Sequence, residues 1–336
     1  MTVTTAFVDL ATFDVADQGM YSGPHALTYF VRHTRKATWF SQIPVKLTRQ
    51  GIPQFGGSCS YTISRSADYM LNAWLEIVIP AVTGSTTGTK EHIRWVPNIG
   101  HMLLKSVSIT FNDLIAEKFD GHWLNFWSAF NVPGSKQVGY ANMVGNVDSL
   151  TLPRESLPQY TLVVPLPFWF ANDSGVSLPT AALPYNDMKI NVEFNEASKL
   201  LVASNAEGAD TNKTIAAGSQ KTTMPTQLTK CNMYANYAVV SNDERKKMAC
   251  SPRDMLIDQV QNLPPVNWNP GSDTQLSVEP KFSHPVKALF YAAHNVTWGY
   301  DSGDYTSHFP ISAGTGQPMK QVGEGHYDAP VKAATL

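Results

Sequence analysis

Short runs rich in β-branched and aromatic residues, each stopped by turn residues, are the feature that most restricts how this chain can fold. The 22 glycines and 22 prolines are spread along the whole length. Runs that fit single strands occupy 39–47, 58–64, 71–79, 103–111, 161–170 and 188–194. Many short strands separated by turns are typical of a β-sandwich or β-barrel, so we predict an all-β fold with short helices.

One segment has a different period. Between 114 and 130, large apolar side chains recur three or four residues apart, and Pro133 and Gly134 follow. We predict an amphipathic helix over 114–130 that lies against the sandwich, its apolar face formed by Ile115, Phe119, Trp123, Phe126, Trp127 and Phe130. We interpret these aromatic side chains as core packing, in preference to a ligand site.

The stretch 196–224 is small and polar after its first few residues, which predicts a linker or exposed loop between two β domains. Beyond it, strand-like runs occur at 231–240, 255–261 and 286–292. A short helix is predicted at 243–248, because acids begin it and bases end it. The length of 336 residues suits two domains of ordinary size.

The charge balance bears on partners. Charged residues make up only 15% of the chain, hydrophobic residues make up 43%, and the formal net charge is −2. So little charge suggests that neighbouring molecules cover much of the surface. The densest basic run, 245–247, follows two acids, which favours a solvated helix over a nucleic-acid patch. We therefore expect no direct contact with nucleic acid.

Targeting and redox signals are weak. The first residues carry no basic region followed by a long apolar run, so no signal peptide is expected. The cysteines are Cys59, Cys231 and Cys250, an odd number without CxxC spacing. This pattern predicts reduced thiols in a cytosolic setting, with neither a disulfide scaffold nor a zinc site.

The search for catalytic patterns finds none. The nine histidines form no HxH or HExxH pattern, and His284 and His294, ten residues apart, have no third ligand beside them. No GxSxG, Walker or GxGxxG sequence occurs. A glycosidase pair of carboxylates from distant strands stays open, although nothing singles out two acids. We expect no catalytic, cofactor-binding or metal-binding residue, and no cofactor.

Longer segments carry a more specific signal. The strongest is PLPFWFANDSGVSLPTAALPYNDMKINVEF at 165–194, in which we predict a strand through Trp169, a tight turn at 172–175 and a returning strand at 185–194. Others include HTRKATWF at 33–40, ISRSADYMLNAWL at 63–75, SITFNDLIAEKFDGHWLNFWSAF at 108–130, GYANMVGN at 139–146, VVSNDERKKMACSPRDMLIDQVQ at 239–261 and FSHPVKALFYAAHN at 282–295. In this order and at these separations, they resemble the major capsid protein of large icosahedral DNA viruses, of the iridovirus type.

The resemblance implies two consecutive jelly-roll β-sandwiches. We expect an N-terminal arm at 1–24, a first jelly roll at 25–195, a linker at 196–224 and a second jelly roll at 225–336. About 110 residues remain for the second roll, fewer than eight strands with loops usually need, so we expect it to lack strands. A truncated product and a divergent short form both remain open.

The resemblance also implies a structural role and no enzymatic activity. In that family, three subunits form a trimer with a pseudo-hexameric outline, and trimers tile the icosahedral virion shell. The expected partners are further copies of the chain, minor capsid proteins and internal viral membrane proteins, with assembly in the host cytoplasm. An alternative is a minor capsid or attachment protein whose jelly roll binds a glycan. A third is a cupin or glycosidase. Copy number in purified particles separates the first two, and metal analysis tests the cupin.

Overall fold

The computed structural model describes residues 3–12, 15–21, 23–30, 32, 37–88, 90–183, 185–205, 214–215, 219–250, 254–267 and 277–292. The chain divides into two compact units, Met1–Trp39 and Phe40–Leu336. The first unit contains helices α1 (Val3–Ala11) and α2 (Val15–Tyr21), both inside the range predicted for the N-terminal arm. Large apolar side chains on these helices, such as Phe7 and Met20, are exposed.

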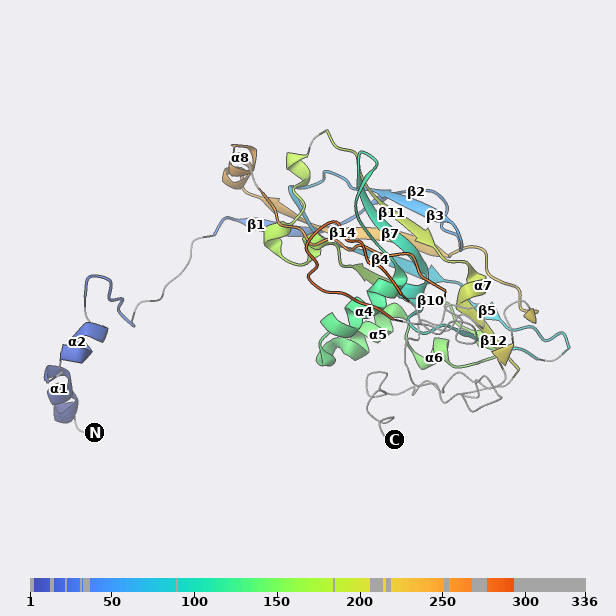
Figure 1. The fold of residues 1–336 in the computed structure, drawn as a ribbon, viewed down its shortest axis with the longest axis horizontal. Helices are drawn as coiled ribbons and strands as arrows, with labels where there is room; N and C mark the ends of the chain where they lie inside the picture. The colour runs from blue at the N-terminus through green and yellow to red at the C-terminus, as the bar shows by residue number, and fades with distance from the viewer. Residues whose placement is uncertain are drawn as a thin grey trace. The chain divides into compact units, whose positions relative to one another are not determined.

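The second unit is built around two antiparallel sheets (Figure 1). Among the described residues, the first sheet has the order β1–β14–β4–β10. Its strands are β1 (Phe40–Lys46), β14 (Lys230–Val240), β4 (Tyr69–Ile79) and β10 (Tyr160–Leu166). Alternate residues of β14, beginning with Cys231 and Met233, are fully buried, because successive side chains of a strand point to opposite faces.

The second sheet has the order β2–β3–β11–β7–β8 within the described part of the chain. Its strands are β2 (Thr48–Gln50), β3 (Ser58–Thr62), β11 (Met188–Phe194), β7 (Leu104–Phe111) and β8 (Leu114–Phe119). Both sheets contribute to one hydrophobic core. Across that core, the Tyr61 hydroxyl of β3 lies 3.1 Å from Cys231 Sγ of β14. Two antiparallel sheets that pack in this order form a jelly roll, which agrees with the all-β prediction.

The position of β14 depends on pairing between distant parts of the chain. It runs antiparallel to β1 on one side, with Ile43 opposite Tyr237, and to β4 on the other, with Leu75 opposite Met233. The sequence places 231–240 after the linker, in the range 225–336. In the structure this strand pairs with β1 and β4, and the boundary between the two rolls stays a prediction.

The predicted helix over 114–130 is wrong in its first part. Residues Leu114–Phe119 form β8, which pairs with β7, and the helix α4 occupies only Gly121–Asn131. Asn112 and Asp113 both have positive φ, 48° and 67°, and so form a tight hairpin turn that returns the chain along β7. The spacing of Ile115 and Phe119 fits a helix, but hairpin pairing decides the conformation.

The strand predicted over 161–170 ends earlier than expected. Strand β10 stops at Leu166, and Trp169–Ala171 forms a 3₁₀ turn, η2. Pro167, directly after β10, lacks the N–H group that a longer ladder would need. The core role predicted for this segment is nevertheless confirmed, because Phe168, Trp169 and Phe170 are all buried.

Shorter elements complete the second unit. Small sheets join β6 (His92–Trp95) to β12 (Leu201–Ser204) and β13 (Thr214–Ile215), and β5 (Val82–Thr83) to β9 (Ser156–Leu157). The helices and 3₁₀ turns are α3 (Ile99–Met102), η1 (Gly134–Lys136), α5 (Gln137–Val144), α6 (Asp148–Thr151), η3 (Ser174–Val176), η4 (Thr180–Ala182), α7 (Ala197–Leu200) and α8 (Asn242–Cys250).

The later part of the chain departs from the strand predictions. Helix α8 confirms the predicted short helix at 243–248 and extends it at both ends. The predicted strands at 255–261 and 286–292 are wrong, since the described residues after Cys250 contain no helix or strand. The predicted linker at 196–224 is described except for 206–213 and 216–218. It contains α7, β12 and β13, and Leu200–Ala203 are fully buried, so its first part is not an exposed loop. Everything after residue 292 lies outside the described residues.

Candidate assembly surface

The described residues offer little for catalysis or metal binding. They contain no group of three or more His, Cys, Asp or Glu side chains that could hold a metal ion. Cys59 and Cys231 are free and buried, and Cys250 is free and exposed. His284 is exposed on an irregular segment, and His294 lies outside the described residues. No helix in the described part of the chain is long and apolar enough to cross a membrane.

Buried carboxylates hold loops in place. Glu91 accepts hydrogen bonds from the backbone N–H of Lys221 at 2.8 Å and of Thr222 at 2.9 Å, and from the Thr222 hydroxyl at 2.7 Å. Glu117 accepts one from the backbone N–H of Trp169 at 3.2 Å. Acceptors of this kind satisfy backbone groups that sheets leave unpaired. We interpret both side chains as structural.

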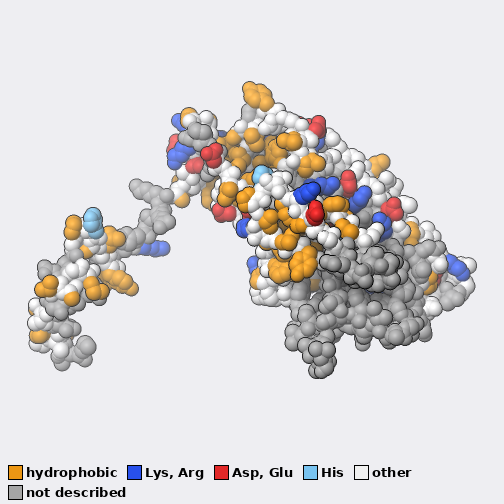
Figure 2. Space-filling model, viewed as in Figure 1, with side chains coloured by type: hydrophobic (Ala, Val, Ile, Leu, Met, Phe, Trp, Pro, Cys, Tyr) orange, Lys and Arg blue, Asp and Glu red, His pale blue; other side chains and the backbone are white. Residues whose placement is uncertain are grey.

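An apolar surface lies where α4 and α5 meet solvent. We call it the α4–α5 surface and define it by Trp127, Phe130, Val138 and Met143. Phe130 is 73% exposed and Val138 is 76% exposed, while Trp127 is half-buried. Figure 2, in the view of Figure 1, shows hydrophobic side chains gathered over these helices. Exposed apolar side chains gathered in this way typically mark a protein–protein contact.

The start of α4 is set by local sequence. The Asp120 side chain accepts a hydrogen bond from the backbone N–H of Trp123 at 2.8 Å, which caps the helix. Gly121 lies against the α3–β7 backbone, where an added Cβ would overlap the carbonyl oxygen of His101. Only glycine allows so close an approach, which seats α4 directly on α3.

A buried histidine connects three helices behind this surface. His101 on α3 is fully buried, with Nδ1 2.7 Å from Asn125 Oδ1 on α4 and Nε2 2.8 Å from the Tyr140 hydroxyl on α5. Burial lowers the pKa of His101 to about 4, although the hydrogen bond to Asn125 opposes that shift. The imidazole is therefore neutral near pH 7 and fixes α4 and α5 relative to each other.

The chain covers part of this region itself. The Phe290 ring stacks on Phe126, with centroids 6.1 Å apart and an interplanar angle of 15°, and lies 5.5 Å from the ring of Phe130. The Gln259 side-chain amide donates to the Ala116 carbonyl oxygen at 2.8 Å. The segments that follow α8 therefore lie along β8 and α4. They remain apolar on their outer side, where Tyr291 is 89% exposed.

The sequence anticipated only part of this surface. The sequence predicts that Phe126, Trp127 and Phe130 share a helical face that packs on the sandwich. In the structure, Phe130 is largely exposed to solvent. Helix α5, which supplies Val138 and Met143, has no clear apolar period in the sequence. No sequence signal distinguished apolar side chains that fill the core from those left exposed.

The fold places the chain in a structural class, the jelly-roll proteins. A quasi-atomic model of the PBCV-1 virus capsid superimposes with a TM-score of 0.54 at 22% identity, over 70% of this chain and 50% of that one. The Faustovirus major capsid protein gives a TM-score of 0.54 at 12% identity, over 72% and 61% of the two chains. These solved structures are double jelly-roll proteins, which confirms the predicted fold class.

Sequence comparison then identifies the family. Residues 28–240 match the model of the major capsid protein N-terminus, and 244–336 match that of the large eukaryotic DNA virus major capsid protein. The chain is 45% identical to the major capsid protein of Invertebrate iridescent virus 6 and 36% identical to that of Frog virus 3, in each case over 99% of this chain and 74% of the relative. The chain belongs to the major capsid protein family of large eukaryotic DNA viruses, which confirms the resemblance and places it in the virion capsid.

Proposed function

We propose that this protein is the repeating subunit of an icosahedral shell and associates through its apolar surfaces into trimers with a pseudo-hexameric outline. The observation that carries the proposal is the exposed α4–α5 surface on a jelly roll of the capsid family. Burying apolar surface is the main favourable term in protein association, at about 25 cal/mol per Å². Upright sandwiches that approximate a hexagon tile a shell without gaps.

The role in the shell needs shape and contact area, and no reaction. We accordingly propose that the protein is not an enzyme and that its partners are further copies of the chain, minor capsid proteins and proteins of an internal viral membrane. The pairing of β14 with β1 and β4 also supports a first roll that extends to Val240, with the second roll after it.

The test compares two exposed apolar positions of the second unit. Val138→Asp places a charge on the α4–α5 surface, and Ile52→Asp places the same charge at a position 68% exposed between β2 and β3. Both variants should fold, as judged by unchanged denaturant midpoints. We expect Val138→Asp to prevent trimer formation, measured by analytical ultracentrifugation, while Ile52→Asp still forms trimers.

Composition of purified virions provides the second measurement. A shell subunit should be the most abundant protein of the particle. A scarce protein that binds a glycan array would point instead to the attachment role. If Val138→Asp forms trimers to the same extent as the wild type, the α4–α5 surface is not the trimer contact.

A further inference from the structure

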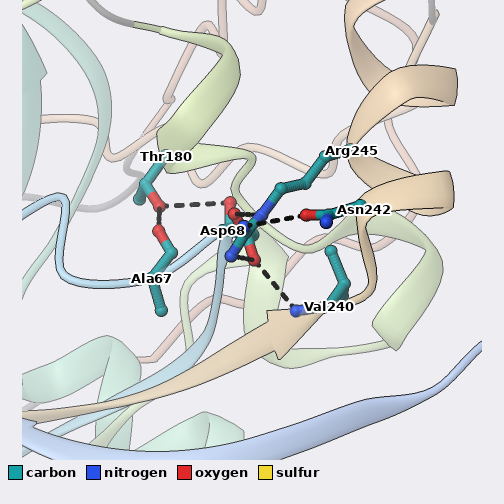
Figure 3. A network of polar contacts seen from close by, with 6 residues as sticks. All are labelled: Ala67, Asp68, Thr180, Val240, Asn242 and Arg245. Atoms are coloured by element: carbon teal, nitrogen blue, oxygen red, sulfur yellow. Dashed lines mark hydrogen bonds and ion pairs between the residues drawn. The ribbon is translucent and has the colours of Figure 1, made fainter.

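The carboxylate of Asp68 is buried, and each of its two oxygens accepts at least one hydrogen bond. Asp68 precedes β4, and its side chain is 7% exposed. Oδ1 accepts from Arg245 Nε at 2.8 Å, and Oδ2 accepts from Arg245 Nη2 at 3.0 Å and from the backbone N–H of Val240 at 2.9 Å. Figure 3 shows the carboxylate between the end of β14 and helix α8. Such a two-point pairing fixes orientation as well as distance.

The backbone around Asp68 is held as firmly as its side chain. Its N–H donates to the Ala238 carbonyl oxygen at 3.1 Å, and its own carbonyl oxygen accepts from the Thr180 hydroxyl at 3.2 Å. Thr180 is fully buried and also donates to the Ala67 carbonyl oxygen at 2.7 Å (Figure 3). The position of the carboxylate is therefore fixed by β14 and η4 as well as by Arg245.

Helix α8 lies at the surface of the described part of the chain. None of its nine residues is buried. A helix this short is marginal without tertiary contacts. Arg245 is the residue by which α8 contacts the roll through an ion pair, and its side chain is 47% exposed. Lys246, the next residue on the helix, is exposed and offers a matched cation.

The ion pair joins the two regions of the chain that match different family models. Asp68 lies in the region 28–240 that matches the N-terminal capsid domain, and Arg245 lies at the start of the region 244–336 that matches the second family model. We propose that Asp68 and Arg245 form an interdomain latch, which fixes the direction in which the chain leaves the first roll. The consequence for assembly rests on the proposed shell function, because tiling needs a constant angle between the two halves of each subunit.

Electrostatics support a latch that is closed at neutral pH. Burial raises the pKa of the Asp68 carboxyl, but the Arg245 guanidinium and the Val240 N–H together outweigh burial and hold this pKa below its ordinary value. The carboxylate is therefore charged at neutral pH, as the Arg245 guanidinium is. Lysine at 245 would supply a charge without the planar pair of donors, so it should close the latch only in part.

An exposed cysteine on α8 allows the mobility of this helix to be measured. Cys250, the last residue of α8, is exposed, while the other two cysteines of the sequence are buried. A nitroxide attached to Cys250 of the folded, full-length protein reports the mobility of α8 by electron paramagnetic resonance. We expect a slow-motion spectrum for the wild type and for Lys246→Ala, and about tenfold more of the mobile component for Arg245→Ala. Arg245→Lys should lie between them.

A double variant separates the latch from general loosening. If the two side chains act as one unit, Asp68→Asn together with Arg245→Ala should be no more mobile than Arg245→Ala alone. An Arg245→Ala spectrum equal to that of Lys246→Ala would overturn the latch, even if particles assemble normally. Failure of the wild type to form particles, with the label still sensitive to Arg245→Ala, would instead count against the shell function and leave the latch standing.

Discussion

The Nε2 atom of the fully buried His101 lies 2.8 Å from the hydroxyl of the partly buried Tyr140, and this contact ties α3 to α5. On its other side, Nδ1 faces Asn125 Oδ1 at 2.7 Å. Because that oxygen can only accept, Nδ1 carries the proton and Nε2 accepts from Tyr140. A neutral imidazole thus satisfies both neighbours. A charged imidazole would place its positive charge in a buried site, away from water.

Acid should therefore weaken the protein through His101. The pKa of His101 falls from its ordinary 6.5 to about 4 on folding, so the unfolded chain binds the proton more tightly. The stability that neutral His101 provides is complete above pH 6.5 and is lost as the pH falls toward 4, by on the order of 3 kcal/mol. Urea unfolding at pH 7 and pH 4.5 measures this loss. His101→Gln should show a smaller decline, and an equal decline would contradict the assignment.

Glu117 should have the opposite pH dependence. Burial raises the pKa of Glu117 to about 7, while the Trp169 N–H lowers it and Asp258 raises it further. The folded state therefore favours the protonated acid, and stability is lost as the pH rises from 4.5 through 7. We expect Glu117→Gln to raise the free energy of unfolding at pH 8 by about 2 kcal/mol and to change it little at pH 4.5. Equal effects at both pH values would rule out this titration.

The cap of α4 should contribute measurably to stability. Asp120 Oδ1 accepts from the Trp123 N–H at 2.8 Å. Replacing a capping side chain by alanine typically costs about 1 kcal/mol, so we expect Asp120→Ala to lower the free energy of unfolding by that amount. Asp120→Ser keeps an acceptor and serves as the control. The idea fails if serine and alanine destabilise equally in urea titrations.

Two glycines on neighbouring helices should respond in opposite directions to alanine. At Gly121, a Cβ would overlap the His101 carbonyl oxygen and lie 2.9 Å from that of Leu104, whereas at Gly139 nothing lies within 4 Å. Gly121→Ala should therefore destabilise the protein by about 2 kcal/mol or more. Gly139→Ala in α5 should stabilise it by about 0.5–1 kcal/mol through helix propensity. Calorimetric melting temperatures measure both effects. A Gly139→Ala variant that is less stable than the wild type would contradict the open space seen around Gly139.

The sequence by itself determined the class and the family. Alternating apolar runs predicted β3, β4, β7 and β11, and Met188–Phe194 has the predicted bounds, because strand periodicity is a local property. The ordered segments from 33 to 295 predicted the capsid resemblance. That resemblance implied a structural role, which the family supports.

Only the tertiary structure decided which distant segments meet. Strand β14 was recognised as a strand, but its place between β1 and β4 depends on pairing across most of the chain. The hairpin at Asn112 and Asp113 turned half of a helix-like pattern into β8, since cross-strand hydrogen bonds outweigh a local preference. Asp68 and Arg245 are separated by 177 positions and have no shared motif. They meet because β14 pairs with β4, which brings α8 beside Asp68, and local periodicity does not predict pairing between distant strands.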